Sequence, residues 1–221
     1  MRSPISRCPA MLLALHFVVN VCAPAVAGQQ TPEPRPRQIA SIVYEGDMAG
    51  LLAKLAQEYG TNIGLELTPG RPKISVKIDL RNDPTLHDVL DAIVRSAQGY
   101  RWREADGAVE VSPAQGGCPL LDAIVEDFQV SGVSQAEAVD HLISLPEVRA
   151  GMGALNLRYG EHNGPPSRTP GEKVSMSLKG ASVRQVLHQI AGRGGGRFWS
   201  FRRYGNRRDG ELFKISTPDR W

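Results

Sequence analysis

An internal repeat constrains the fold of this chain more than any other feature of the sequence. Residues 82–113 read NDPTLHDVLDAIVRSAQGYRWREADGAVEVSP, and residues 180–218 read GASVRQVLHQIAGRGGGRFWSFRRYGNRRDGELFKISTP. Each segment predicts a capped amphipathic helix, a glycine break, an aromatic strand, an Asp-Gly turn and a last strand. Self-similarity of this kind indicates a repeated structural unit, so we expect two copies of one small fold.

The rest of the chain extends the same match. Leu51, Leu52, Leu55 and Ala56 correspond to Ala138, Val139, Leu142 and Ile143 at one constant offset, and Trp102 corresponds to Trp199 in the later segment. Helices are predicted to begin after caps at Asp47, Thr85, Ser134 and Ser182. The strands are expected near 38–44, 62–67, 73–80, 100–104 and 108–112, and again near 123–130, 155–159 and from 174. The prediction is an α+β protein with two repeated small two-layer domains. Each is roughly β-α-β-β-α-β-β, with helices packed on a mixed sheet.

The N-terminal residues have the composition of a secretory signal peptide. Arg2 and Arg7 precede an apolar run at 11–21, and Ala25-Val26-Ala27 is a small-x-small cleavage site. A buried N-terminal helix is the alternative, but no cap or amphipathic period supports it. The expected organisation is a signal peptide at 1–27, a Pro-rich leader at 28–37, a first domain at 38–113, a linker at 114–122 and a second domain at 123–218. We therefore expect a periplasmic or secreted protein without a transmembrane span after cleavage.

The cysteine content and the net charge add little to the prediction of fold and localisation. Cys8 and Cys22 lie in the signal peptide, so Cys118 is either a free thiol or an intermolecular bridge. The sequence has 26 basic and 23 acidic residues, but nine Lys or Arg and no acid occur between Lys173 and Arg208.

We find no catalytic constellation in the sequence. His87, His141, His162 and His188 lack the spacing of metal ligands, and we expect His87 and His188 on the polar sides of their helices. Cys118 has no local base. The glycine run 192–196 follows a helix instead of opening one, so it cannot use a helix N-terminus to bind a phosphate. We expect no enzymatic activity, no metal and no cofactor, and we assign the paired Trp102 and Trp199 to the core.

One stretch is a candidate for partner binding. Residues 197–208 read RFWSFRRYGNRR, and arginine together with aromatic residues favours binding surfaces. The candidate residues are Arg197, Phe198, Phe201, Arg202, Arg203, Tyr204, Arg207 and Arg208. Export argues against nucleic acid, which leaves an acidic protein surface, anionic lipid headgroups or cell-wall polymer as partners. The alternative is a solvated hairpin whose Phe198 or Trp199 packs on the sheet.

The segment 46–113 resembles the short N-terminal domain of secretins and TonB-dependent receptors. The resemblance lies in the helix LLAKLAQEYGTNIGLE, the strand ISVKIDLRN, the helix LHDVLDAIVRSAQGYRW and the closing DGAVEVSP, and 125–218 resembles a more divergent copy. In secretins such domains form the periplasmic entrance, and in transducing receptors they signal to an anti-sigma regulator. This sequence shows no barrel or pore domain after the repeats and no TonB-contact motif, so the resemblance implies only the binding role.

Three functional hypotheses follow. The first is an exported, non-enzymatic adaptor of an envelope secretion, TonB-type transport or signalling system. The second is a structural envelope subunit that self-associates through sheet edges or Cys118. The third is a small-ligand-binding or hydrolytic protein with its site between the copies, which requires a pocket with convergent titratable groups.

Overall fold

The computed structural model describes residues 41–70, 73–160, 172–204 and 211–217, and it confirms the α+β class. The signal peptide, the leader and the proposed contact residues Arg207 and Arg208 lie outside these ranges. The first half contains, in chain order, β1 (Ser41–Asp47), α1 (Met48–Tyr59), β2 (Asn62–Glu66), β3 (Ser75–Arg81), α2 (Leu86–Ser96), β4 (Tyr100–Ala105) and β5 (Ala108–Pro113).

The second half repeats this order with two additions. A short 3-10 helix, η1 (Pro119–Asp122), precedes it, and α4 is inserted after α3. The elements are β6 (Ile124–Val133), α3 (Gln135–Ser144), α4 (Pro146–Ala154), β7 (Leu157–Tyr159), β8 (Val174–Ser182), α5 (Val183–Arg193), β9 (Phe198–Tyr204) and β10 (Glu211–Ser216). The helix α4 was not predicted from the sequence. Pro146 occupies its first turn, where the missing N–H costs no helical hydrogen bond.

The predicted helix starts are confirmed. The Asp47 side chain accepts from the backbone N–H of Gly50 at α1, and full capping boxes begin the helices α2, α3 and α5 at Thr85, Ser134 and Ser182. The predicted hairpin turn between β4 and β5 is also present. Asp106 and Gly107 have φ angles of 52° and 72°, the left-handed pair that a tight two-residue hairpin loop requires.

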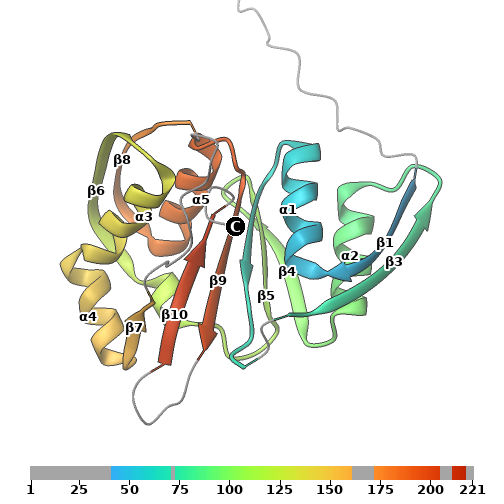
Figure 1. Cartoon of the computed structure of the whole chain (residues 1–221), viewed down its shortest axis with the longest axis horizontal. Coiled ribbons are helices and arrows are strands. Elements are labelled where there is room, and N and C mark those ends of the chain that lie inside the picture. Colours follow the sequence, from blue (N-terminus) through green and yellow to red (C-terminus); the bar gives the residue numbers. More distant parts are fainter. Residues whose placement is uncertain (1–40, 71–72, 161–171, 205–210, 218–221) are drawn as a thin grey trace, which may run out of the picture. The chain divides into compact units, whose positions relative to one another are not determined.

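The two halves share one central sheet of six strands, in the order β4-β5-β2-β9-β10-β7 (Figure 1). The junction is the parallel pair β2–β9, in which Ile63 lies opposite Phe198 and Gly64 lies opposite Trp199. Two antiparallel ribbons, β1–β3 and β6–β8, complete the fold. The shared sheet was not predicted from the sequence, because pairing between distant parallel strands leaves no periodic signal.

The copies enter this sheet in opposite orientations. The strand β2 is parallel to both β5 and β9, whereas β9 is antiparallel to β10 and β10 is parallel to β7. Corresponding strands such as β2 and β7 therefore run in opposite directions while keeping their order in the sheet. This relation turns the second copy over, so α1 and α2 lie on one face of the sheet and α3 and α5 on the other (Figure 1).

Two hydrophobic cores fill the two sides of the sheet. One contains Ile63, Leu65 and Phe198 beneath α1 and α2, and the other contains Trp199 and Phe201 beneath α3 and α5. Neighbouring residues of β9 alternate between the two cores, as successive side chains of a strand must. None of the helices in the described segments has the length and hydrophobicity needed to cross a bilayer.

The segment 114–122, predicted as a linker, contributes to the second core. Its first residues are exposed, but Cys118, Leu120 and Leu121 are buried. The C-terminal part of this segment, from Cys118 through η1, is therefore part of the second core.

Candidate functional site

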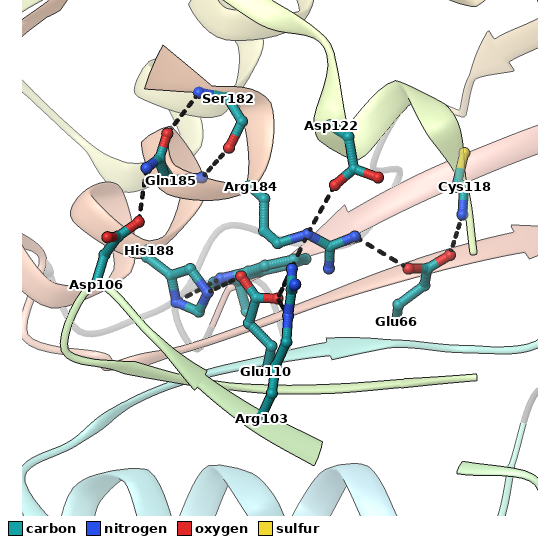
Figure 2. A network of polar contacts seen from close by, with 11 residues as sticks. Glu66, Arg103, Asp106, Glu110, Cys118, Asp122, Ser182, Arg184, Gln185 and His188 are labelled. Carbon is teal, nitrogen blue, oxygen red and sulfur yellow. Dashed lines mark hydrogen bonds and ion pairs between the residues drawn. The ribbon is translucent and has the colours of Figure 1, made fainter. Parts of the chain in front are cut away.

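A buried polar cluster lies where α5 of the second copy crosses strands β2 and β5 of the first copy (Figure 2). Its central residues are Glu66, Glu110, Arg184 and His188, all at most 7% exposed. Glu66 and Glu110 lie on the side of their strands opposite to the first core, which takes Leu65, Val109 and Val111. Buried charges are stable only when they are paired and hydrogen-bonded, so the cluster fixes α5 against these strands.

Arg184 is the shared cation of the cluster. Its Nη2 atom lies 3.3 Å from Oε2 of Glu66, and its Nε atom lies 3.4 Å from Oδ1 of Asp122 and 3.8 Å from Oε2 of Glu110. The Cys118 backbone N–H donates to Oε1 of Glu66. Burial nevertheless raises the pKa of Glu66 above its ordinary value, because desolvation outweighs these favourable contacts.

For Glu110, the favourable contacts outweigh the effect of desolvation on the pKa. Burial alone raises its pKa, but the neighbouring His188, the Arg103 ion pair and the charge of Arg184 together hold the pKa of Glu110 below its ordinary value. Arg103 donates to Oε2 of Glu110 from Nε at 2.8 Å and from Nη2 at 2.7 Å. Glu110 is therefore the stably ionised carboxylate of the cluster.

The tautomer of His188 follows from its partner. The indole N–H of Trp199 donates to Nδ1 of His188 at 3.2 Å, and an indole nitrogen is only a donor. Nδ1 must therefore be the unprotonated nitrogen, and Nε2 carries the proton. Nε2 makes no hydrogen bond among the described residues and faces Oε1 of Glu110 at 3.7 Å, which is too long for one.

Gly64 makes this arrangement possible. A Cβ atom at Gly64 would lie 2.5 Å from the Trp199 ring and 2.9 Å from Cε1 of His188. Only the absence of a side chain on β2 lets Trp199 lie across the strand and reach His188.

A cavity of about 230 Å³ opens beside the His188–Glu110 contact. Its walls come from both copies: the β4–β5 turn with Asp106, the end of β8 with Lys179, and α5 with Gln185. Gln185 donates to Oδ2 of Asp106 at 2.6 Å and also completes the α5 capping box with Ser182 (Figure 2). The helix cap thus ties the β4–β5 turn to one side of the cavity.

The basic, aromatic tract predicted to bind a partner lies mainly on β9, so its described side chains point to both faces of the sheet. Phe198 and Phe201 are fully buried, one in each core. Arg197 donates to the backbone carbonyl of Gly60, and Arg203 pairs with Glu211 at 3.5 Å. The remaining described members are Arg202, which is half-buried, and Tyr204, which is 37% exposed.

Arg202 and Tyr204 share one face of the second copy, the face of β9, β10 and β7 turned away from α3 and α5. The strand register places Arg202 opposite Lys214 and Tyr204 opposite Leu212, and it pairs Leu212 with Arg158 on β7. Arg158 is exposed, and Leu212 is 37% exposed. We call this set, Arg158, Arg202, Tyr204, Leu212 and Lys214, the basic sheet face.

The structure corrects two expectations about individual residues. His188 is 5% exposed and not on a polar side, because α5 packs against β8 on one side and β2 and β9 on the other. Trp102 is only half-buried, and its indole N–H donates to Asp91 at 2.7 Å. His87 is exposed, as predicted, and contacts Glu104 at 2.8 Å.

Cys118 is a free thiol that is 1% exposed, and burial raises its pKa. A bridge between two chains through Cys118 would require this segment to open. Across the described ranges, no three His, Cys, Asp or Glu side chains are grouped in a way that could hold a metal ion.

The cluster was not predicted from the sequence because its members are far apart in the chain. Glu66 and Arg184 are 118 positions apart. The available signal was a single carboxylate within each of two otherwise apolar strands, NIGLE and AVEVSP. Comparison of the chain with models of known protein families and with curated proteins finds no match.

Proposed function

We propose that the protein is an exported, non-enzymatic adaptor of an envelope secretion, TonB-type transport or signalling system. In this proposal the basic sheet face binds an acidic surface of a partner protein. The observation that supports it most is the grouping of Arg158, Arg202 and Lys214 with Tyr204 and Leu212 on one sheet face.

Electrostatics favours an acidic partner for this face. The strand register places the cations Arg158, Arg202 and Lys214 on one face of neighbouring strands. A carboxylate-bearing surface placed over this face is attracted by their positive charge and can form charge-assisted hydrogen bonds with it. Tyr204 and Leu212 add the apolar contact area that binding surfaces combine with cations.

The setting in the envelope rests on the sequence of residues 1–27 and on the resemblance of both halves to short secretin and TonB-type domains. Those domains bind other proteins of the envelope, and the proposal carries this role to the present chain. Within the described residues β4 and β7 are the edge strands of the central sheet, and they offer a second means of association through added strands.

The test is a crosslinking pull-down from the envelope fraction with two matched double variants. Arg158→Ser with Arg202→Ser removes two charges from the basic sheet face. Arg101→Ser with Arg149→Ser removes two exposed charges from elsewhere and serves as the control. The proposal predicts that wild type and control capture the same secretion, transport or signalling protein, and that the face variant loses it. Equal capture by all three proteins contradicts the basic sheet face as the contact.

A further inference from the structure

We propose that the cavity between the two copies binds a small, neutral, hydroxyl-rich molecule, such as a single sugar unit, through His188 and Glu110. The cavity is lined by the β4–β5 turn of the first copy and by β8 and α5 of the second. This binding site is separate from the basic sheet face and does not depend on the adaptor proposal.

The chemistry of the two facing atoms selects the ligand group. Nε2 of His188 is a proton donor without a hydrogen-bond acceptor within the described part of the chain. Oε1 of Glu110, 3.7 Å away, is an acceptor, while Oε2 of the same carboxylate holds Arg103. A ligand atom that satisfies both must accept from His188 and donate to Glu110.

A hydroxyl group, like water, does both through a single oxygen atom. An oxygen atom about 2.8 Å from each of the two atoms spans their 3.7 Å separation. An ammonium group donates to Glu110 but has no lone pair for the His188 N–H. An anion accepts from His188 but has no proton to donate to Glu110, and the Glu110 carboxylate repels it.

The arrangement is fixed before any ligand binds. Trp199 holds His188 in the tautomer that presents Nε2–H, and Arg103 holds the Glu110 carboxylate ionised. Both side chains are at least nine-tenths buried and both line the cavity, so a ligand inside the cavity lies against them. Preorganised groups of this kind lower the entropic cost of binding.

The size and walls of the cavity define the ligand further. A water needs about 10–15 Å³ of cavity space, whereas the pockets that bind drug-sized ligands measure roughly 300–1,000 Å³. The volume of about 230 Å³ therefore suits a molecule larger than water and smaller than a drug. Asp106, Lys179 and Gln189 on the walls supply further polar groups for additional hydroxyls.

The experiment is a titration followed by the indole N–H signal of Trp199 in a nitrogen–proton correlation spectrum, assigned with a Trp199→Phe variant. D-glucose and N-acetyl-D-glucosamine are the hydroxyl probes, and ethylammonium chloride and sodium phosphate are the charged probes. The proposal predicts a saturable shift with at least one sugar, because a ligand on Nε2 changes the hydrogen bond between Trp199 and His188.

Two variants locate the binding. Ala105→Leu adds bulk at the cavity wall at a residue that takes no part in the buried ion pairs, and Ala150→Leu makes the same change on exposed α4. Thermal unfolding establishes that both are folded. We expect Ala105→Leu to weaken sugar binding by about tenfold or more and Ala150→Leu to leave it unchanged. No saturable shift with either sugar, a response to the charged probes alone, or equal sugar binding by folded Ala105→Leu would overturn the proposal.

Discussion

Replacing Arg184 by Met tests whether the buried polar cluster holds the two copies together. Methionine keeps most of the aliphatic stem but removes the charge that pairs with Glu66 at 3.3 Å. Glu66 is 1% exposed and would keep only the Cys118 N–H as a hydrogen-bond partner among the described residues, so its charge is left largely uncompensated. Breaking a buried ion pair by removing one member costs about 3–5 kcal/mol.

Urea unfolding measures this cost directly, with Arg149→Met on exposed α4 as the matched control. We expect Arg184→Met to lower the free energy of unfolding by about 3–5 kcal/mol. The control should change it by less than about 0.5 kcal/mol. In a chain of this size the loss corresponds to a fall in Tm of about 6–20 °C.

A second change distinguishes an uncompensated charge from lost packing. Glu66→Gln in the Arg184→Met background removes the stranded charge, so we expect the double variant to be more stable than Arg184→Met by about 0.5–3 kcal/mol. A double variant that loses the sum of the two single effects, or an Arg184→Met protein as stable as its control, would refute the reasoning.

Three further predictions follow from the same structure. Gly64→Ala should lower the free energy of unfolding by about 1–3 kcal/mol, because its Cβ would meet the Trp199 ring at 2.5 Å. Gly153→Ala, where a Cβ meets no atom within 4 Å, is the control and should not destabilise the protein. Chemical denaturation compares the two variants, and equal stability would contradict the packing described. The Cys118 thiol, buried and with a raised pKa, should react with a thiol-specific reagent far more slowly in the native protein than in urea, and rapid stoichiometric reaction of the native protein would be inconsistent with its burial. Because the pKa of Glu66 is raised in the native protein, its contribution to stability is fully present below the ordinary pKa of 4.5 and is lost as the pH rises through the native pKa. The free energy of unfolding of wild type minus that of Glu66→Gln should therefore fall with rising pH in this window. A flat or rising difference would argue against a raised pKa.

Local features were predictable from the sequence because their causes are local. The caps at Thr85, Ser134 and Ser182 depend on residues three positions apart, and the Asp106-Gly107 turn depends on two neighbours. The helical stripes and the α+β class follow from hydrophobic periodicity. These elements match the structure closely.

The shared sheet and the polar cluster were not predictable in this way. The strand β2 pairs in parallel with β9, and nothing in NIGLE indicates a partner more than a hundred residues away. Because β2 is covered on both sides, Glu66 became a core residue paired with Arg184. His188 was assigned to a polar helix face for the same reason, since an isolated helix pattern does not reveal that α5 is packed on two sides.

Contact between Gly64 and Trp199 tests the central structural claim most directly, because these residues belong to different copies and lie opposite each other across β2 and β9. The measurement is the nuclear Overhauser effect between the α-protons of Gly64 and the indole ring protons of Trp199 in the full chain. The shared sheet predicts a strong effect, since a Cβ at Gly64 would lie within 2.6 Å of two atoms of that ring. A folded protein that shows the contacts within each copy but none between Gly64 and Trp199 would contradict the shared sheet and, with it, the site between the copies.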